Sequence, residues 1–239
     1  MQSLSVLIPA YNEEMLVQKT ALCMLDYLKS LKIDFEIILC INDSTDKTED
    51  IAKALSKRYK QIKYLSINKK GFGLALQQGI RTAKKDLITY MPADNEIAHD
   101  FIGKALEEIK NFDIVSGSRY IKGASQSTTL LFRKFLSRAY AAIIRLFFSS
   151  KITEFGTVKM FRSDWAKKMV NECTSVHWDF QVEMLYFALR DKKRIKEIPL
   201  QVKYQFSRES SVNPLNDIVS LFKSAIKYGI KLRTHQLFH

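Results

Sequence analysis

The sequence has few residues that break or cross-link regular structure. Its 239 residues include only 8 Gly, 4 Pro and 3 Cys, while 46% are hydrophobic. These contents exclude collagen-like repeats and a disordered low-complexity chain, and a chain of this length can bury a full core without disulfides. The cysteines, Cys23, Cys40 and Cys173, lie far apart and lack the paired short spacings of a zinc site. We therefore expect core thiols in a reducing, intracellular compartment.

Acidic residues are scarce relative to basic ones. Asp and Glu number 25 against 38 Lys and Arg, a formal net charge of +13, which predicts a polyanionic partner. A membrane-spanning run of ~20 apolar residues is also missing, because the longest stretch, 139–148, is interrupted by Arg145. The N-terminus has no basic region before its apolar run, so no signal peptide is expected. The predicted location is cytoplasmic and peripheral to a membrane, with no transmembrane segment.

Short β-branched runs alternate with helical patterns, which is typical of βαβ units and a mainly parallel sheet. The segment 152–204 continues the same domain with a strand, two helices and an edge-like strand. Strands are expected at 4–8, 35–41, 62–67, 87–91 and 114–118, with helices at 13–30, 47–59, 73–84 and 99–111. Each of these strands ends in a polar cluster, and ligands of open α/β sheets bind outside the carboxyl ends of the strands. The five clusters should therefore line one crevice.

A glycine turn follows the third expected strand. Gly71 and Gly73 would let backbone N–H groups approach a phosphate, and Lys70 adds positive charge. A plain glycine turn before a helix remains the alternative. Leu76 occupies the position where a dinucleotide fingerprint requires Gly, so the pattern does not favour NAD binding.

Carboxylates follow two other strands. Asp43 suits hydrogen bonding to a base or ribose, whereas Ser44 or Asp46 suits the cap of the next helix. Asp94 and Glu96 come directly after an apolar strand, and two hard oxygen donors there could hold Mg²⁺ or Mn²⁺ together with water and a diphosphate. The alternative is that one of them begins the next helix at its positive end.

Two segments combine apolar and basic residues without acids. Between residues 114 and 153 there is no Asp or Glu, and apolar residues recur at helical spacing over 132–147. The acids are again missing after Asp217, where Lys223, Lys227 and Lys231 follow each other at intervals of four. The apolar face expected beside them comprises Leu221, Phe222, Ala225, Ile226 and Ile230. Segments 127–150 and 211–239 are thus predicted as basic amphipathic helices at an anionic bilayer, the alternative being core helices with a solvated face.

The clusters also form an ordered set along the chain. Its members are Ser5-Val6-Leu7-Ile8-Pro9-Ala10-Tyr11-Asn12-Glu13, Asn42-Asp43-Ser44, Asn68 with Gly71-Phe72-Gly73-Leu74-Ala75, Ala93-Asp94, Ser118-Arg119-Tyr120 and Glu197-Ile198-Pro199. This set resembles the family 2 glycosyltransferases of the GT-A fold, in particular the dolichol-phosphate mannose synthase and polyprenyl-phosphate sugar transferase branch. The resemblance implies a mixed, mainly parallel α/β sheet flanked by helices over residues 1–210. The basic amphipathic helix predicted from the residue pattern over 211–239 follows this domain.

The resemblance also implies roles for particular residues. The nucleotide-sugar would be held by Pro9, Tyr11, Glu13, Asn42, Asp43, Lys70, Gly71, Ala93 and Asp94. A Mg²⁺ or Mn²⁺ ion would be held by Asp94 and Glu96. The acceptor phosphate would be bound by Arg119, Arg133, Lys159 and Arg208, with Asp94, Arg119 and Arg133 as the catalytic residues. Three positions depart from the family pattern: Pro92 replaces the first Asp of the metal motif, Glu96 replaces a Gln, and Thr153 replaces an Asp beside Glu154.

The expected activity is inverting transfer of a sugar from a nucleotide-diphospho-sugar to a polyprenyl or dolichyl phosphate at the membrane surface. A phosphate monoester with a second pKa near ~6 needs no general base, whereas a hydroxyl acceptor would need one, for which Asp179 and Glu183 are candidates. A hydroxyl-acceptor enzyme and a non-catalytic nucleotide-sugar or lipid-binding subunit remain alternatives. Nucleic-acid binding is not expected because no recognised module is present, and a membrane-protein partner or a homo-oligomer is compatible with the sequence.

Overall fold

The computed structural model describes residues 2–94, 99–126, 142, 144–148, 152–202 and 214–238. Its centre is a seven-stranded sheet in the order β3-β2-β1-β4-β7-β5-β8. The strands are β1 (Ser3–Ala10), β2 (Asp34–Asn42), β3 (Ile62–Ile67), β4 (Leu87–Tyr90), β5 (Ile114–Ser118), β7 (Lys159–Arg162) and β8 (Ile195–Pro199). Two short strands, β6 (Ser125–Gln126) and β9 (Gln201–Val202), form a separate parallel pair.

The direction of the strands places most loop ends at one edge of the sheet. β1 pairs in parallel with β2 and β4, and β2 pairs in parallel with β3. β7 is antiparallel to both β4 and β5, so β5 points the same way as β4, and β8 runs parallel to β5 at the end of the sheet. Every strand of this sheet except β7 therefore ends at a common carboxyl edge. The predicted mixed, mainly parallel sheet is confirmed.

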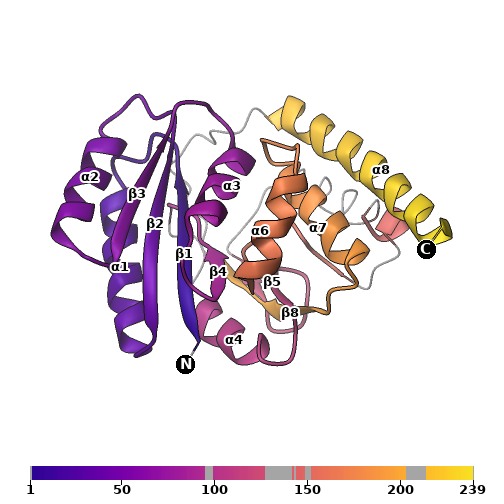
Figure 1. Cartoon of the computed structure of the whole chain (residues 1–239), viewed down its shortest axis with the longest axis horizontal. Helices are drawn as coiled ribbons and strands as arrows, with labels where there is room; N and C mark the ends of the chain where they lie inside the picture. The colour runs from indigo at the N-terminus through magenta and orange to yellow at the C-terminus, as the bar shows by residue number, and fades with distance from the viewer. Residues whose placement is uncertain are drawn as a thin grey trace.

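Helices cover both faces of the sheet, which explains why its central strands are almost wholly apolar. They are α1 (Val17–Ser30), α2 (Thr48–Arg58), α3 (Phe72–Thr82), α4 (Asp100–Glu108), α6 (Ser163–Glu172), α7 (Phe180–Arg190) and α8 (Pro214–Phe238). Figure 1 shows β1, β2 and β3 between α1 and α2 on one side and α3 on the other. Val17, Ala21, Met24 and Leu28 of α1 are fully buried at helical spacing, so this face of α1 packs on the sheet.

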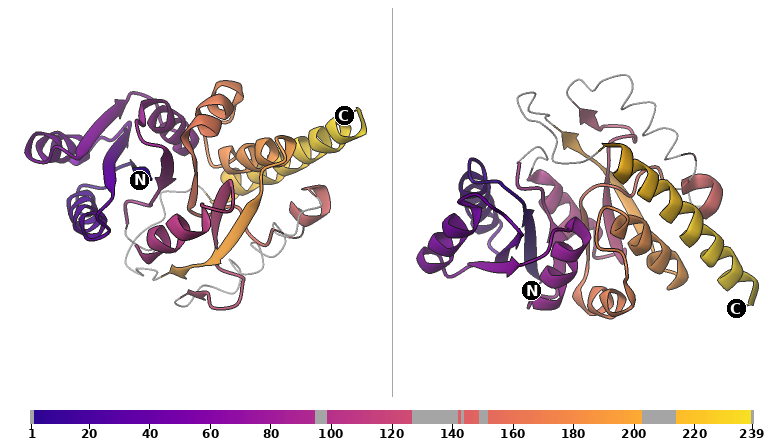
Figure 2. Two further views of the ribbon diagram at one scale, coloured as in Figure 1. Left: turned by 60° about the horizontal axis from the view of Figure 1, so that its bottom comes forward. Right: turned by 90° about the horizontal axis from the view of Figure 1, so that it is seen from above.

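The C-terminal part of the chain forms a helical layer beside β5 and β8. Residues 180–188 of α7 are all buried, because α8 covers the side of α7 that the sheet leaves open (Figures 1 and 2). Ala225, Tyr228 and Leu232 of α8 are at most 3% exposed. Helical residues 144–148 also contact α8, where the Arg233 guanidinium donates to the Leu146 carbonyl.

The expected elements largely agree with the structure. Strands 62–67 and 114–118 have the expected bounds, and the other expected strands and helices differ by a few residues. Helix α1 begins at Val17 instead of residue 13, because the Glu13 carbonyl accepts hydrogen bonds from the backbone N–H groups of Leu16 and Val17 in a preceding turn. Within the described ranges, no helix has both the length and the apolar character to cross a bilayer.

Candidate functional site

The loops after β1 and β2 are bound to each other at the carboxyl edge. The backbone N–H of Asn12 donates to Ser44 Oγ at 3.1 Å, and the Asn12 side-chain oxygen accepts from the backbone N–H of Thr45 at 2.8 Å. One residue further along, the backbone N–H of Glu13 donates to Thr48 Oγ1 at 2.7 Å. The N-cap of α2 is Lys47, and not Asp46 or Ser44 as the alternative predicted. The Asp46 carboxylate, one residue earlier, accepts from the backbone N–H of Thr48, the first residue of the helix, at 3.0 Å.

Asn12, two residues after β1, and Asp43, directly after β2, each have a left-handed backbone. Their φ angles are 53° and 54°, a region that Asn and Asp adopt more readily than other non-glycine residues. This conformation turns the chain sharply out of the sheet, and it leaves the Asp43 side chain exposed at the edge. Backbone strain of this kind is often concentrated at ligand sites.

The glycine turn before α3 joins the same two loops. The Asn42 side-chain oxygen accepts a hydrogen bond from the Gly71 backbone N–H at 2.9 Å, and Asn42 is 6% exposed. The Lys70 ammonium lies 4.1 Å from the centre of the Tyr11 ring, a cation–π contact that holds a positive charge over the first loop. Gly71 has an extended φ, so its need for glycine comes from close packing: a Cβ there would lie 2.4 Å from the Val176 carbonyl oxygen.

The loop after β4 carries the predicted metal ligand. The Met91 backbone N–H donates to the Leu7 carbonyl at 2.9 Å, and Thr20 Oγ1 on α1 donates to the Ala93 carbonyl at 2.6 Å. Asp94 follows directly and is half-buried. Glu96 lies outside the described residues, and within those residues no three His, Cys, Asp or Glu side chains are grouped as potential metal ligands. Of the two predicted metal ligands, Asp94 is therefore the one whose position the structure describes.

Arg119 follows β5 at the same edge and is held by Glu154. The Glu154 carboxylate accepts from the Arg119 backbone N–H at 2.7 Å and from its Nε at 2.8 Å. Glu197 of β8 in turn accepts from the backbone N–H groups of Thr153 and Glu154, at 2.9 and 2.8 Å. The Arg119 side chain remains 26% exposed. Glu154, whose backbone is held by Glu197, thus orients a guanidinium that still reaches solvent.

Lys159 is enclosed by the protein, which does not support its predicted role at the acceptor phosphate. Its ammonium donates to the Thr157 carbonyl at 2.7 Å, to Gln181 Oε1 at 2.7 Å and to the Tyr90 hydroxyl at 3.0 Å, and the residue is 0% exposed. Burial lowers the pKa of Lys159 well below its ordinary value. All three hydrogens of the Lys159 ammonium are thus donated to groups of the protein. Through these bonds Lys159, on β7, is linked to Tyr90 of β4 and Gln181 of α7.

The predicted acceptor residues Arg133 and Arg208 lie outside the described residues. Among those that are described, Pro9, Tyr11 and Glu13 are half-buried, whereas Lys70 is exposed and Ala93 is 4% exposed. The contacts above connect the loops of Tyr11, Asn42 and Gly71 directly. Sequence reasoning did not predict the bridging roles of Asn12 and Glu154, although an Asn in the loop after a strand is a recognisable signal for a side chain that bonds to loop backbone.

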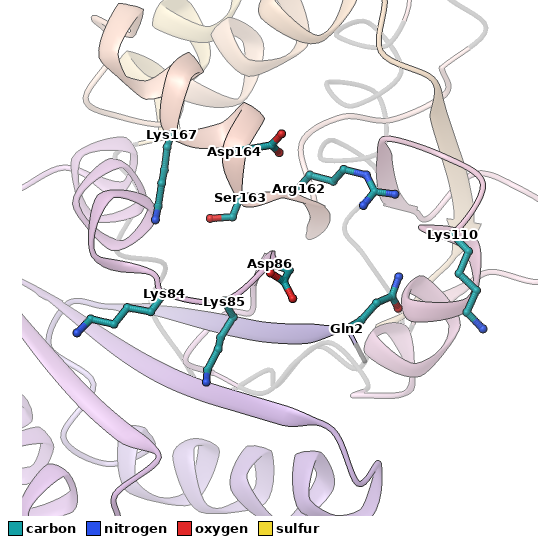
Figure 3. Close-up of a pocket in the computed structure, with 9 residues that line it drawn as sticks. All are labelled: Gln2, Lys84, Lys85, Asp86, Lys110, Arg162, Ser163, Asp164 and Lys167. Carbon is teal, nitrogen blue, oxygen red and sulfur yellow. The ribbon is translucent and has the colours of Figure 1, made fainter.

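A hollow lies at the opposite, amino edge of the sheet (Figure 3). It is open, has a volume of about 1030 Å³, and is lined by Lys84, Lys85, Lys110, Arg162 and Lys167 together with Asp86 and Asp164. Two of its lysines are already paired with carboxylates, Lys85 with Asp34 at 2.7 Å and Lys110 with Glu107 at 2.6 Å. Because its charges are mixed and partly paired, this hollow does not resemble a built anion site.

The sheet order, the loops joined at the carboxyl edge and the glycine turn that opens α3 together define an α/β fold whose polar loops gather at one edge. Solved structures of glucosyl-3-phosphoglycerate synthase from Mycobacterium tuberculosis have this fold. The complex with uridine diphosphate has a TM-score of 0.70 at 14% identity, covering 95% of this chain and 80% of that one. A complex with Mn²⁺, UDP-glucose and phosphoglyceric acid also has a TM-score of 0.70. These likenesses confirm the expected GT-A fold.

Sequence comparison identifies the family. Residues 5–170 match the family described as glycosyl transferase family 2, and the chain therefore belongs to that family. AglD, a glycosyltransferase of Haloferax volcanii, is 27% identical over 223 residues, which cover 91% of this chain and 35% of AglD. The dolichol-phosphate mannosyltransferase of Pyrococcus furiosus is 32% identical over 143 residues, 59% of this chain and 40% of the relative.

A third relative is the dolichyl-phosphate beta-glucosyltransferase ALG5A of Trichomonas vaginalis. It is 30% identical over 213 residues, which are 83% of this chain and 65% of the relative. The chain thus spans between 35% and 65% of the length of these three relatives. The family resemblance expected from the sequence is confirmed.

Proposed function

We propose that this chain is an inverting glycosyltransferase that transfers a sugar from a nucleotide-diphospho-sugar to a polyprenyl or dolichyl phosphate at a membrane surface. The observation that carries the proposal is the connection of three strand-end loops at the carboxyl edge. Asn12 joins the first loop to the second, and Asn42 joins the second to the glycine turn. This arrangement prepares one polar surface for a nucleoside and its diphosphate before the ligand arrives, which reduces the ordering cost of binding.

The charges of this surface suit a diphosphate. The exposed Lys70 ammonium and the N-terminus of α3 both favour negative charge beside the glycine turn. Asp94, a hard oxygen donor on the neighbouring loop, fits Mg²⁺ or Mn²⁺, ions that bind through one or two carboxylates together with substrate phosphates. When bound, such an ion would stabilise the charge of the departing nucleoside diphosphate. Solved relatives in fold contain Mn²⁺ or Mg²⁺ together with uridine diphosphate.

A phosphate acceptor is favoured over a hydroxyl acceptor by the state of the candidate bases. Glu183 is 2% exposed and its carboxylate accepts from backbone N–H groups of residues 174 and 175. Asp179 accepts from the His177 backbone N–H at 3.2 Å and from the Ser224 hydroxyl at 3.4 Å. Glu183 is therefore enclosed by the protein, and the half-buried Asp179 carboxylate is turned toward groups of the protein itself. A lipid phosphate is already an anionic nucleophile, so it needs no such base, and the partly exposed Arg119 would offset its charge as it attacks the anomeric carbon.

The membrane location is supported by the outer face of α8. Val219, Ile226 and Ile230 lie on one side of this helix and are 50%, 41% and 52% exposed. Lys223 and Lys227 are exposed on the same side. An exposed apolar stripe flanked by cations and lacking acids is suited to the interface of an anionic bilayer, where the polyprenyl tail of the acceptor also lies.

The proposal is tested by donor binding and by transfer. A thermal-shift panel of nucleotide-sugars with and without Mn²⁺ should raise the melting temperature for one donor, because a ligand of the folded form stabilises it by mass action. That donor should then glycosylate a polyprenyl phosphate, and NMR of the product should show the inverted anomer. Asp94→Asn should reduce kcat by about a hundredfold, since metal stabilisation of developing charge is worth several kcal/mol.

Asp164→Asn is the matched control, because Asp164 is an exposed carboxylate at the opposite edge of the sheet (Figure 3). It should leave kcat unchanged. Donor binding without any transfer would instead favour a non-catalytic binding subunit. Transfer to a glycan hydroxyl but not to a lipid phosphate would contradict the proposed acceptor.

A further inference from the structure

Two acids at the start of α7, Asp179 at its N-cap and Glu183 in its first turn, hold the segment 174–177 in place. Thr174 and Ser175 donate their backbone N–H groups to the Glu183 carboxylate at 3.0 and 2.8 Å, and His177 donates its own to Asp179 at 3.2 Å. The segment joins α6 to α7 and has no regular secondary structure of its own over 173–176. Its backbone geometry therefore depends on these carboxylates. A buried carboxylate that accepts hydrogen bonds from several N–H groups holds them rigidly. Breaking these bonds would leave a buried charge and buried donors without partners, which is costly in free energy.

The same segment forms the wall behind the glycine turn. The Leu74 backbone N–H donates to the Val176 carbonyl at 2.9 Å, and Gln77 Nε2 donates to the Ser175 carbonyl at 2.7 Å. The segment packs so closely on the glycine turn that a Cβ on Gly73 would lie 2.7 Å from the His177 carbonyl oxygen. The Phe72 and Trp178 rings stack with centroids 4.0 Å apart. A displacement of the segment would therefore displace the turn that carries Lys70 and Gly71.

Helix α8 reaches the carboxylates of Asp179 and Glu183 from the other side. The Tyr228 hydroxyl donates to Glu183 Oε1 at 2.5 Å, and one turn earlier the Ser224 hydroxyl lies 3.4 Å from Asp179. Tyr228 is 3% exposed, and burial together with the Glu183 carboxylate raises its pKa to about 12, so the hydroxyl keeps its proton and stays a donor. A continuous chain of contacts thus runs from α8 through Glu183 and the segment 174–177 to the glycine turn.

We propose that Glu183 and Tyr228 are positioning residues for the nucleotide-sugar donor, through which α8 sets the donor affinity of the glycine turn. The proposal rests on the function proposed above, in which that turn binds the donor diphosphate. Neither residue touches the donor. Each acts by holding the wall that packs on Gly71 and Gly73, so their loss should affect donor binding and leave acceptor binding unchanged.

The test is donor binding to the full chain with the Tyr228→Phe variant, which removes one hydroxyl and keeps the buried ring. We expect the donor Kd measured by calorimetry, and the donor KM, to rise by about tenfold, within the usual range of coupling between sites. The acceptor KM should stay at its wild-type value. The matched control is Tyr186→Phe, because Tyr186 is a buried α7 tyrosine whose ring lies 5.5 Å from that of Tyr228 and whose hydroxyl makes no hydrogen bond within the described residues.

A second variant separates positioning from simple loss of stability. Glu183→Gln keeps the shape of the side chain but weakens acceptance from Tyr228 and the two backbone N–H groups. If both residues act along one path, the double variant should raise the donor Kd no more than the stronger single variant does. A fall in melting temperature with an unchanged donor Kd would overturn the inference, as would equal rises in donor and acceptor KM. If the wild-type chain binds no nucleotide-sugar at all, the function proposed above fails first, which is a distinct result.

Discussion

At the scale of single residues, buried or half-buried polar side chains hold backbone groups at the carboxyl edge. Asn42 binds the Gly71 N–H, Glu154 binds the Arg119 N–H, and Glu197 binds the N–H groups of Thr153 and Glu154. These side chains replace backbone partners that irregular loops lack, since a buried N–H without an acceptor is costly. The groups left exposed, such as Asp43 and Lys70, are then those available to a ligand.

Asn42→Ala tests this at one hydrogen bond. The Gly71 N–H is buried and would lose its acceptor, so the free energy of unfolding in urea should fall by about 1–3 kcal/mol. Donor affinity should fall as well, because the glycine turn would no longer be joined to the loop after β2. Asn111→Ala, at an exposed position beyond α4, should change neither quantity. Unchanged donor affinity in Asn42→Ala would contradict the role of Asn42 in the donor site.

At the scale of elements, α8 has two apolar faces where the sequence predicted one. Ala225 is buried against α7 together with Tyr228 and Leu232, whereas Ile226 and Ile230 remain exposed on the opposite side. The helix therefore both stabilises α7 and presents apolar residues to the surroundings. In the function proposed above, the exposed Ile residues in line with Lys223 and Lys227 form the surface that would meet a bilayer, and the buried face of α8 would stay packed on α7.

Reversing charge on the outer face of α8 should release the protein from lipid. Lys223→Glu with Lys227→Glu should reduce binding to vesicles containing anionic lipid by at least about thirtyfold, since each cation near such a surface contributes ~1 kcal/mol. Cosedimentation measures it. The control is Lys57→Glu with Lys60→Glu, which makes the same change of net charge at exposed positions at the end of α2, far from α8 (Figure 1). Equal loss in both double variants would show that net charge alone drives binding.

At the scale of the whole molecule, the two edges of the sheet differ in what their polar groups do. The carboxyl edge carries the joined loops, whereas the amino edge carries a buried carboxylate, Glu36, that links three strands. Glu36 accepts from Ser5 Oγ at 2.7 Å and from the Lys84 backbone N–H at 2.6 Å, and it pairs with Lys63. Burial by itself raises the pKa of Glu36, but the hydrogen bonds from Lys63, Ser5 and Lys84 outweigh it and hold the pKa below its ordinary value.

This shift predicts how stability depends on pH. A carboxylate whose pKa is lower in the folded state contributes stability that is fully present above the unfolded-state pKa, near ~4.3, and is lost as pH falls through the folded-state pKa. Glu36→Gln should therefore lower the free energy of unfolding by about 1–3 kcal/mol at pH 7 and reduce its decline below about pH 5. Denaturant titrations from pH 7 to pH 3 measure both. Glu107→Gln, in an exposed pair on α4, should leave the curve unchanged, and an unaltered slope in Glu36→Gln would refute the assignment.

Much of the fold and of the donor half of the site could be predicted before any tertiary contact was known. Strands and helices follow from periodicity, and the strand-end positions of Asp43, Gly71 and Asp94 follow from the order of the elements. The burial of Lys159 and Glu183 could not be predicted, because each is surrounded by residues from distant parts of the chain. Lys159 meets Tyr90 and Gln181, and Glu183 meets Tyr228. Residue type and local spacing carry no information about such neighbours.

By itself, the sequence determined the order of strands and helices, the edge at which the polar loops gather, and the family. These depend on the repeat of apolar residues and on turn chemistry, which act over a few residues at a time. Only the tertiary structure decided that β7 enters the sheet antiparallel between β4 and β5 and that α8 packs with Tyr228 inward. It also decided that Lys159, expected at the acceptor phosphate, and Glu183, a candidate base for a hydroxyl acceptor, are enclosed. The reason is that the burial of a side chain depends on which elements pack together in space. A polar group that becomes buried by this packing must form hydrogen bonds within the protein, and it then holds the packed elements together.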